Sequence, residues 1–276
     1  MSIKYAYLGP TGTFTEAALK KISSPSDQLI AYANVTAALD AVRNGECQKA
    51  LVPIENSVEG VVARTLDELA IGQPLVITAE TTLPVSFSLM TLSNTNPVEI
   101  KSIATHPHAE SQCRSFIARN YPNAQVIESS STAAAAKGLS KGDYDAAIAG
   151  SNAAKNYDLK VVAENIGDNS GAVTRFVLVE KPGNQLKATG KDRTSLAVFI
   201  ALDHAGALLE ILNEFAKHQV NLTFIQSRPT GSQLGHYHFI IDAEGHIEDK
   251  PISAALAGLK EICEDIRFLG SYPQAK

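Results

Sequence analysis

The stretch IKYAYLGPTGTFTEAALKKI, residues 3–22, contains the pattern that decides the fold. Ile3–Leu8 is an apolar run typical of a strand, and a Gly/Pro/Thr turn joins it to the helical pattern of Thr15–Ile22. The same alternation of strand, tight turn and helix recurs along most of the chain. It predicts an α/β fold whose sheets are built from right-handed crossovers. Ligands of such folds collect where strands end and helices begin.

The other elements up to Glu180 follow from the hydrophobic period. Strands are expected at Ala50–Pro53, Leu75–Thr81, Ser86–Met90, Ser102–Thr105, Ala124–Glu128, Ala146–Ala149 and Thr174–Glu180. Helices are expected at Val35–Arg43, Gly60–Ile71, Ala109–Asn120 and Thr132–Leu139.

A polar linker separates these elements from a second domain. Lys181–Asp192 (KPGNQLKATGKD) carries two glycines and a proline and has no apolar period. Beyond it we expect strands and helices in the order βαββαβ, which is ferredoxin-like. The expected ranges are Ser195–Ala201, Gly206–His218, Asn221–Ser227, His236–Ile241, Pro251–Cys263 and Arg267–Leu269. The domain boundaries are therefore predicted at residues 1–182 and 193–276.

Composition disfavours several classes of partner. The 276 residues include 24 Lys and Arg against 29 Asp and Glu, and no basic block occurs, which disfavours nucleic acid and anionic membranes. The three cysteines, Cys47, Cys113 and Cys263, lie far apart without metal-ligand spacing. This pattern predicts a reduced, cytoplasmic protein without a metal site.

Two polar clusters each follow a strand and precede a helix. In LGPTGTFTEAA (residues 8–18) the glycines let backbone N–H groups face an anion, but they form neither GxGxxG nor a P-loop. A tight turn alone explains this cluster equally well. VPIENSVEG (residues 52–60) holds more polar side chains than a connection needs: Glu55, Asn56, Ser57 and Glu59. The alternative for Ser57 is a helix N-cap.

Two further clusters have the same setting. In ATHPHAESQC (residues 104–113), His106 leads into a helix whose first turn suits an anion, and a metal pair with His108 lacks a third ligand. SSSTAAAA (residues 129–136) places hydroxyl groups at the start of a helix, where Ser131 or Thr132 as a simple N-cap is the alternative. AAIAGSNAA (residues 146–154) repeats the strand, turn and helix design.

An arginine beside a threonine opens the strand that starts at Thr174. Strand alternation puts Thr174 and Phe176 on one face and Arg175 on the other, and such an arginine suits carboxylate recognition. No GxSxG, HExxH or P-loop motif occurs in the sequence. Anion binding and hydrogen bonding therefore remain as the predicted chemistry.

Taken together, these clusters resemble the prephenate dehydratase family followed by an ACT regulatory domain. The matching strings of the first domain are YLGPTGTFTEAA (7–18), PIENSVEG (53–60), HPHAESQC (106–113), ENIGD (164–168) and TRF (174–176). In the second domain, GALLEILNEF (206–215) and QSRP (226–229) fall where the ACT domain of the family has its GAL and ESRP motifs.

The chain departs from the family pattern at four positions. His108 stands where the family usually has Gln, and Ala172 stands where Asn often precedes TRF. Ala205 replaces a Pro near GAL, and Gln226 replaces the Glu of ESRP. The catalytic strings are thus kept better than the effector strings.

The resemblance implies two α/β lobes like those of a periplasmic binding protein, with the site in the cleft. Lobe one is expected at about residues 1–76 plus 164–182 and lobe two at about 77–163, with hinges near Leu75–Glu80 and Val161–Asn165. The implied activity is that of a carbon–oxygen lyase. It converts prephenate to phenylpyruvate in L-phenylalanine biosynthesis and needs no cofactor.

The resemblance also implies roles for individual residues. The catalytic residues are Thr174, Arg175 and Phe176, and Thr174 gives a hydrogen bond to the leaving hydroxyl. The substrate-binding residues are Thr11, Gly12, Glu55, Asn56, Ser57, His106, Ser130, Ser131 and Thr132. Among them Glu55 is expected to position the lobe rather than to act as the acid.

For the ACT domain the resemblance implies pairing with a second copy, in a homodimer or homotetramer, and an amino-acid effector, L-phenylalanine. The effector-binding residues are Gly206, Ala207, Leu208, Asn221, Leu222 and Thr223. Two alternatives remain. One is arogenate dehydratase, which performs the same elimination on the amino-acid analogue, and the other is a non-catalytic sensor of a dicarboxylate and an amino acid.

Overall fold

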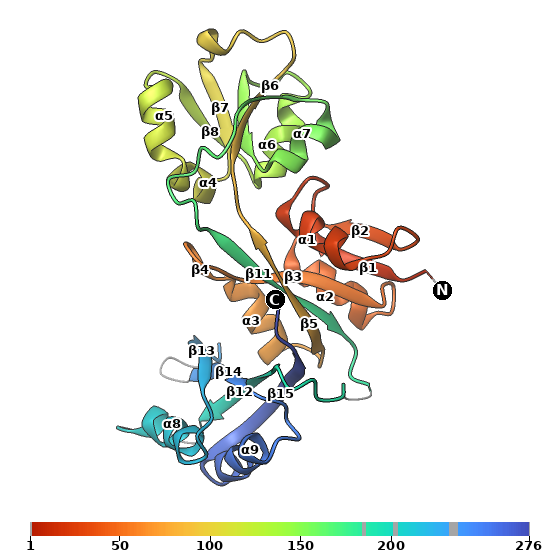
Figure 1. Cartoon of the computed structure of the whole chain (residues 1–276), viewed down its shortest axis with the longest axis vertical. Helices are drawn as coiled ribbons and strands as arrows, with labels where there is room; N and C mark the ends of the chain where they lie inside the picture. Colours follow the sequence, from red (N-terminus) through yellow and green to blue (C-terminus); the bar gives the residue numbers. More distant parts are fainter. Residues whose placement is uncertain (1, 184–185, 201–203, 232–236, 276) are drawn as a thin grey trace. The chain divides into compact units, whose positions relative to one another are not determined.

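The computed structural model describes residues 2–183, 186–200, 204–231 and 237–275. In this part of the chain, the strands form three separate sheets, and helices pack against them (Figure 1). The predicted mixed α/β fold is therefore confirmed. The expected strand ends at Ala201 and His236 lie outside the described residues.

The first sheet has the strand order β2-β1-β3-β11-β5, with β4 paired to β3. Its strands are β1 (Lys4–Leu8), β2 (Gln28–Tyr32), β3 (Lys49–Asn56), β4 (Gly60–Val61), β5 (Val76–Pro84) and β11 (Val173–Glu180). The helices between them are α1 (Phe14–Ile22), α2 (Val35–Arg43) and α3 (Ala63–Ala70). β1 and β2 are parallel, as a crossover through α1 requires.

Two expectations for this sheet were wrong in detail, and one strand was not expected. β3 continues past Pro53 to Asn56, and the helix expected from Gly60 begins only at Ala63. The reason is a short antiparallel pairing in which Glu55 lies opposite Val61 and Asn56 opposite Gly60. β2 was not predicted, because this edge strand has no fully buried residue and hence no clear apolar alternation.

The second sheet has the order β10-β6-β9-β7-β8. Its strands are β6 (Ser88–Thr91), β7 (Ser102–Thr105), β8 (Gln125–Glu128), β9 (Ala146–Ala149) and β10 (Lys160–Ala163). Its helices are η1 (Pro97–Glu99), α4 (Pro107–Gln112), α5 (Arg114–Asn120), α6 (Thr132–Leu139) and α7 (Ser151–Tyr157). The single helix expected at Ala109–Asn120 is two helices, because Cys113 leaves the helical conformation with φ −118° and ψ 13°.

Strand alternation builds a separate core on each face of the second sheet. Ile103 and Ile148 pack with Ala109 and Ile117 of α4 and α5 on one face. The alanines that alternate with them, including Ala104, pack with α6 and α7 on the other face. Figure 1 shows these two helix pairs on opposite sides of the strands. The alanine-rich face lets α6 and α7 approach the sheet closely.

Two segments connect the first and second sheets. Val85–Phe87 leads from β5 to β6, and Glu164–Ala172 leads from β10 back to β11. They are hydrogen-bonded to each other: Val85 N donates to Ala172 O at 2.7 Å, and Ile166 N donates to Phe87 O at 3.0 Å. The crossing expected near Leu75–Glu80 is therefore corrected to Val85–Phe87, because β5 stays in the first sheet as far as Pro84.

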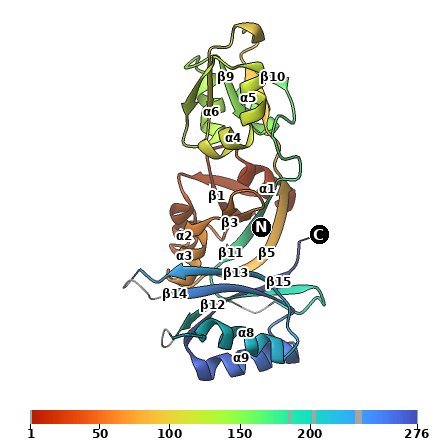
Figure 2. The same cartoon turned by 90° about the vertical axis from the view of Figure 1, so that its left-hand side faces the viewer.

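The third sheet has the order β13-β14-β12-β15. It consists of β12 (Asp192–Ile200), β13 (Leu222–Pro229), β14 (Tyr237–Glu244) and β15 (Cys263–Pro273) with α8 (Ala207–Lys217) and α9 (Lys250–Ile262). Figure 2 shows both helices on one face of this sheet. There Ile211, Phe215 and Leu259 of the helices form a core with alternate residues of the strands. The predicted βαββαβ order is confirmed.

The chain divides into two compact units. One consists of Met1–Ala38, Leu51–Val61 and Thr82–Phe176, and the other of Leu39–Ala50, Val62–Thr81 and Val177–Lys276. All residues expected to serve catalysis or substrate binding belong to the first unit, and those expected to bind the effector belong to the second. None of the helices that the structure describes has the length and hydrophobicity to span a membrane.

Candidate active site

Thr174 lies where β11 begins, beside the end of β3. The two segments are tied by reciprocal bonds, because Ser57 N donates to Val173 O at 2.9 Å and Val173 N donates to Ser57 Oγ at 2.9 Å. Next to this pair, Asn56 Nδ2 of the residue before Ser57 donates to Thr174 Oγ1 of the residue after Val173, at 2.9 Å. The Thr174 hydroxyl oxygen thus accepts from Asn56, which leaves its own hydrogen to be donated elsewhere.

The Ser57 side chain does not cap a helix, so that alternative is wrong. The N-cap position of α3 is Val62, which makes no side-chain capping bond. Ser57 instead begins a turn that Asn56 organises, since Asn56 Oδ1 accepts from Val58 N at 2.9 Å and from Glu59 N at 2.9 Å. Such a turn at an asparagine holds both ends of the amide, one on the backbone and one on Thr174.

Arg175 and Phe176 continue β11 into the interior. The Arg175 guanidinium, in a residue only 8% exposed, lies 3.9 Å from Glu55 Oε2, which is too long for a direct hydrogen bond. Phe176 is 1% exposed and is one of the largest fully buried side chains. Packing in the core explains the position of Phe176. The burial of its ring gives no support for a contact with a ligand.

The turn after β1 is shaped by glycine and by a buried carboxylate. Gly12 has φ +92°, a conformation that favours glycine. Its N–H donates to Glu16 Oε2 at 2.5 Å, while Thr13 is the N-cap of α1 and accepts from Glu16 N at 3.3 Å. The Thr11 hydroxyl lies 3.4 Å from the hydroxyl of Tyr7. The Gly12 N–H is therefore already satisfied within the turn.

Helix α7 of the second sheet contacts this turn of the first. Asn152 Nδ2 donates to Gly12 O at 2.9 Å and to Thr13 O at 3.2 Å, and Tyr157 Oη donates to Thr11 O at 2.7 Å. Burial raises the pKa of the Tyr157 phenol, and the charge of Glu16 acts in the same direction, so the phenol remains a donor at neutral pH. These bonds join the first sheet, with its helices, to the second at one place.

Helix α4 contacts the first sheet at a second place. Gln112 Nε2 donates to Glu59 Oε1 at 2.8 Å, and Ser111 Oγ lies 3.5 Å from the same oxygen. His108 Nδ1 lies 3.8 Å from Glu59 Oε2. Glu59 belongs to the turn that follows Asn56, so this contact involves the same loop that holds Thr174.

His106 is the N-cap of α4. Its Nδ1 accepts from His108 N at 3.2 Å, and the two imidazoles stack edge-on with their centres 4.8 Å apart. Burial and the neighbouring His108 lower the pKa of His106, while Glu59 and Glu128 act in the opposite direction. The neutral form that can accept this capping bond is thereby favoured.

At the start of α6 the capping interpretation is confirmed for Ser131. Its Oγ accepts from Ala134 N at 3.0 Å. Ser130 precedes it on the exposed side, and Thr132 is the first residue of the helix. Ser131 Oγ can still donate its hydrogen to a ligand, because accepting one bond leaves the hydroxyl proton free.

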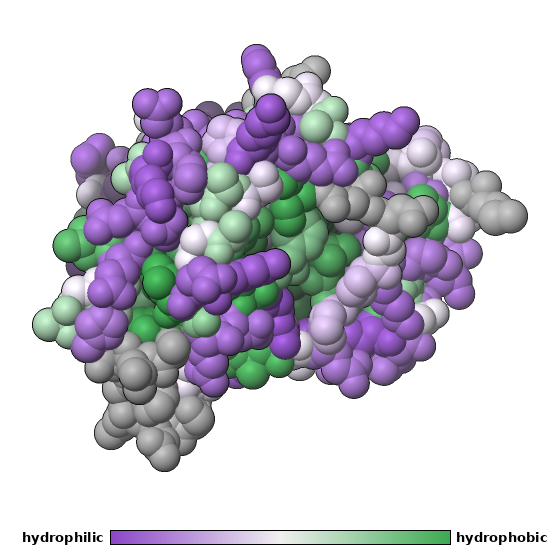
Figure 3. Space-filling model, turned by 90° about the horizontal axis from the view of Figure 1, so that it is seen from below, coloured by the Kyte–Doolittle hydropathy of each residue, from purple (hydrophilic) through white to green (hydrophobic). Residues whose placement is uncertain are grey.

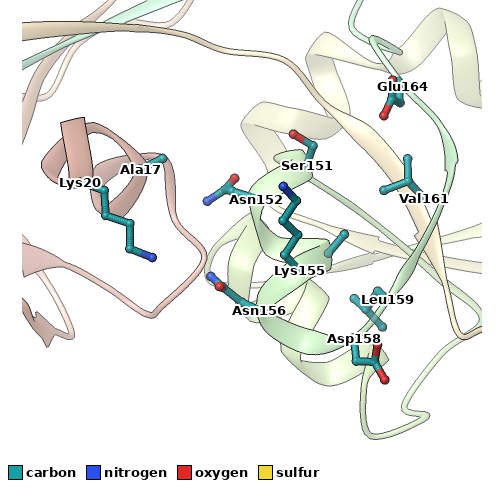
Figure 4. A pocket seen from close by; sticks show the side chains of 11 residues that line it. Ala17, Lys20, Ser151, Asn152, Lys155, Asn156, Asp158, Leu159, Val161 and Glu164 are labelled. Carbon is teal, nitrogen blue, oxygen red and sulfur yellow. The ribbon is translucent and has the colours of Figure 1, made fainter. Parts of the chain in front are cut away.

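A hollow of about 740 Å³ lies between α1 and α7 (Figure 4). Lys20 lines it from the side of α1, and Asn152, Lys155 and Asn156 line it from α7. Lys20 is paired with Glu16 at 2.7 Å. The residues lining it include none of the expected site residues. Asn152 nevertheless reaches from the rim of the hollow to the turn at Gly12.

In the second unit, the expected effector-binding residues fall into two groups. Gly206, with φ +102°, is the N-cap of α8, and Ala207 and Leu208 begin that helix. Asn221 precedes β13, and its carbonyl accepts from Glu244 N at 2.9 Å. Leu222 and Thr223 begin β13, where the Thr223 hydroxyl lies 3.4 Å from Asp242 O.

The sheet face opposite to α8 and α9 contacts α3 within the same unit. Arg228 of β13 forms a fork with Asp67 of α3, with both nitrogen–oxygen distances at 2.8 Å. Opposite Arg228 on β14 lies His238, fully buried and stacked on Phe199 with ring centres 5.0 Å apart. Neither ring nitrogen of His238 has a hydrogen-bond partner among the described residues. Burial lowers the pKa of this imidazole.

Sequence reasoning missed several of these contacts. Gln112, Asn152 and Tyr157 were not proposed as site residues, although two of them lie in motifs that were singled out. Their only signal was the polar character of HPHAESQC and AAIAGSNAA next to a helix start. Among the described residues, no group of three or more His, Cys, Asp or Glu side chains is arranged to hold a metal ion.

Comparison with known proteins gives a consistent result over the whole chain. The family model described as "Prephenate dehydratase" matches residues 5–184, and the model for the ACT domain matches residues 194–261. The curated prephenate dehydratase of Amycolatopsis methanolica is 45% identical over 273 residues, which cover 99% of this chain and 89% of that protein.

Two solved structures resemble the chain over nearly its full length. The prephenate dehydratase of Arthrobacter aurescens in complex with L-Phe has a TM-score of 0.91 and 49% identity, covering 98% of this chain and 90% of the other. A protein described as GqqA, a quorum quenching acylase, has a TM-score of 0.86 and 26% identity, covering 98% of each chain.

Proposed function

Because the chain belongs to the prephenate dehydratase family, we propose that it converts prephenate into phenylpyruvate around Thr174, under control of its ACT domain. The reaction is a carbon–oxygen lyase step. The dianion takes up one proton and yields the phenylpyruvate anion, carbon dioxide and water. Electrons of the bond to the ring carboxylate move into the ring as the C–O bond breaks, and aromatisation drives the reaction.

The observation that carries this assignment is the bond from Asn56 to Thr174. Asn56 Nδ2 donates to Thr174 Oγ1 at 2.9 Å, so the hydroxyl hydrogen of Thr174 points away from Asn56. That hydrogen is donated to the leaving hydroxyl of prephenate and stabilises the charge that develops on it. A threonine is too weak an acid to protonate the leaving group outright, and it therefore polarises the group or relays a proton.

The two carboxylates of prephenate require different treatment. The side-chain carboxylate is anchored, and the candidates are Arg175, Thr11, Ser57, His106 and the start of α6 at Ser130, Ser131 and Thr132. Gly12 shapes its turn but does not donate to the substrate, because its N–H is bonded to Glu16. The ring carboxylate is lost and must not be stabilised, since only interactions stronger in the transition state accelerate the step. Asn56 orients the substrate, Glu55 positions Arg175, and Phe176 contributes packing alone.

We assign the cleft to two lobes, one built on the first sheet and one on the second, so the boundary expected between residues 76 and 77 moves to the crossing at Val85–Phe87. The contacts of Asn152 with Gly12 and of Glu59 with Gln112 support a closed arrangement of these lobes. Closure excludes water and strengthens hydrogen bonds to the leaving group.

The decisive experiment is to incubate the purified chain with prephenate and with arogenate in parallel. We expect phenylpyruvate from prephenate, with turnover on arogenate lower. Preferred turnover of arogenate would assign the chain to arogenate dehydratase. Binding of prephenate without any turnover would reassign it as a sensor and refute the proposal.

For the ACT domain we propose L-phenylalanine as the effector, because the 49% identical structure is described in complex with L-Phe. Its α-carboxylate and α-ammonium groups meet backbone and amide groups at Gly206–Leu208 and Asn221–Thr223. Side-by-side pairing of two ACT domains, in a homodimer or homotetramer, completes the site. Leu209 of α8 and Ile225 of β13 are exposed apolar side chains. Figure 3, which labels no residues, shows apolar surface among polar side chains on one face of the molecule.

Two measurements test this part. Calorimetry with phenylalanine, tyrosine and tryptophan should show binding of phenylalanine, and light scattering should show a species larger than one chain. Inhibition requires that the effector bind one arrangement of the enzyme more tightly than the other. Absence of binding by all three amino acids would refute the regulatory proposal.

A further inference from the structure

We propose that Glu59 is a positioning residue that couples contact between the two lobes to the orientation of Thr174. This inference rests on the proposed reaction at Thr174. Glu59 follows Asn56 by three residues and reaches Gln112 on α4, so it connects the loop that holds the threonine with the second sheet.

The coupling follows an unbroken series of hydrogen bonds. Thr174 Oγ1 accepts from Asn56 Nδ2 at 2.9 Å, and Asn56 Oδ1 accepts from Glu59 N at 2.9 Å. Glu59 Oε1 then accepts from Gln112 Nε2 at 2.8 Å. The backbone and the side chain of Glu59 thus take part in two consecutive links, and displacement of Glu59 also displaces the amide that holds Thr174.

The far end of the series is firmly held. Gln112 is 8% exposed, and its carbonyl accepts from Asp168 N at 2.6 Å. Asp168 Oδ2 in turn accepts from Ser115 N at 3.1 Å at the start of α5. The backbone of Gln112 is therefore anchored and its side chain is buried, so the amide that meets Glu59 is presented from a well-held part of α4.

The chemistry of Glu59 favours a positioning role over contact with substrate. Its carboxylate is negative, and prephenate is a dianion, so direct contact would be repulsive. The groups within reach of the carboxylate are the Gln112 amide, the Ser111 hydroxyl at 3.5 Å and the His108 imidazole at 3.8 Å. The neutral amide makes the shortest of these contacts, which indicates a specific hydrogen bond rather than general attraction between charges.

The test exchanges the two partners. Glu59→Gln removes the charge, Gln112→Glu places two carboxylates against each other, and the double variant restores an amide–carboxylate pair in the reverse order. We expect each single variant to lower kcat on prephenate, Gln112→Glu by about 10- to 100-fold, because a charge-assisted bond is lost. The double variant should recover most of this loss. Glu110→Gln on the same helix is the matched control and should keep the wild-type kcat.

The outcomes separate this inference from the proposed function. If the wild type forms no phenylpyruvate, the proposed function fails. If the wild type is active and both single variants match it, the positioning role is refuted. It is equally refuted if the singles are impaired, melt like the wild type, and the double variant recovers nothing. Glu59→Asp serves as the second variant: its carboxylate keeps the charge but is one methylene shorter, so its kcat should fall as in Glu59→Gln. A wild-type kcat in Glu59→Asp would refute the need to reach Gln112.

Discussion

Asn56 Nδ2 lies 2.9 Å from Thr174 Oγ1, although 118 residues separate them in the chain. The contact exists because β3 and β11 are neighbours in the first sheet and because Ser57 and Val173 exchange two hydrogen bonds, one between backbone groups and one to the Ser57 hydroxyl. The geometry defines the direction of the bond, since the asparagine amide nitrogen can only donate and the threonine oxygen must accept.

The first prediction reverses this bond. In Asn56→Asp the side chain keeps its shape, but an ionised carboxylate accepts only, so the Thr174 hydroxyl turns toward it and no longer toward the leaving group. We expect kcat to fall about 10-fold or more, as for loss of one stabilising donor. Asn169→Asp is the control, because the Asn169 side chain accepts from Gly171 N and an aspartate can accept the same bond. A wild-type kcat for Asn56→Asp would show that the bond does not orient Thr174.

The second prediction concerns the hydroxyl itself. Thr174→Ala should lower kcat by about 10² to 10⁴ fold, the range for loss of general-acid assistance, whereas Thr174→Ser keeps the hydroxyl and should retain most activity. Turnover is followed by phenylpyruvate formation, and circular dichroism checks the fold. Equal turnover of the alanine variant and the wild type would remove Thr174 from the mechanism.

The third prediction concerns the fork between Arg228 and Asp67. The two side chains are 22% and 29% exposed, so Asp67→Asn should change the free energy of unfolding by only about 1 kcal/mol. We expect a larger effect on regulation, because the fork joins β13 to α3. L-Phenylalanine should still bind in calorimetry but should change prephenate turnover less. Asp40→Asn, which removes the charge of an exposed carboxylate paired with the buried side chain of Arg43, should leave regulation intact.

The fourth prediction concerns pH and stability at His238. Burial holds its folded pKa below the ordinary value of 6.5, so below pH 6.5 the unfolded chain binds a proton that the folded chain does not. Stability is therefore fully present above pH 6.5 and is lost as the pH falls below it. The groups facing this imidazole are Phe199, Arg228 and Asp67.

His238→Leu should reduce this loss, and at neutral pH it should leave stability unchanged or higher, because two unpartnered buried nitrogens are replaced by apolar atoms. Urea unfolding above and below pH 6.5 measures both effects. His204→Leu, whose imidazole is 49% exposed, is the control. An identical pH dependence in His238→Leu and the wild type would contradict the prediction.

Local sequence patterns were enough for most elements. The ranges expected for α2, β7, α6 and β9 are those observed, because each has a clear apolar period and ends in turn residues. β2 was not predicted, because an edge strand without a buried face has no such period. The break between α4 and α5 at Cys113 was not predicted, because a local change of backbone angles leaves the apolar spacing intact.

In the candidate site, too, the local motifs could be predicted, whereas contacts between distant residues could not. The polar cluster around Asn56, the hydroxyl groups near Ser131 and the pair Thr174–Arg175 could be recognised from residue type and position. Whether Ser57 capped a helix or bonded another strand could not be decided, because both require the same hydroxyl at the same place. Gln112 was not found, since its partner Glu59 lies 53 residues away in the chain.

The sequence by itself determined the α/β and βαββαβ patterns, the set of polar clusters and the family resemblance, because these depend on residue type and short-range spacing. Only the tertiary structure decided that Asn56 meets Thr174, that Glu59 meets Gln112 and that Arg228 meets Asp67. The physical reason is that a hydrogen bond forms only between atoms about 3 Å apart. Strand order and the crossings between sheets bring such atoms together. A local hydrophobic period contains no information about strand order or crossings.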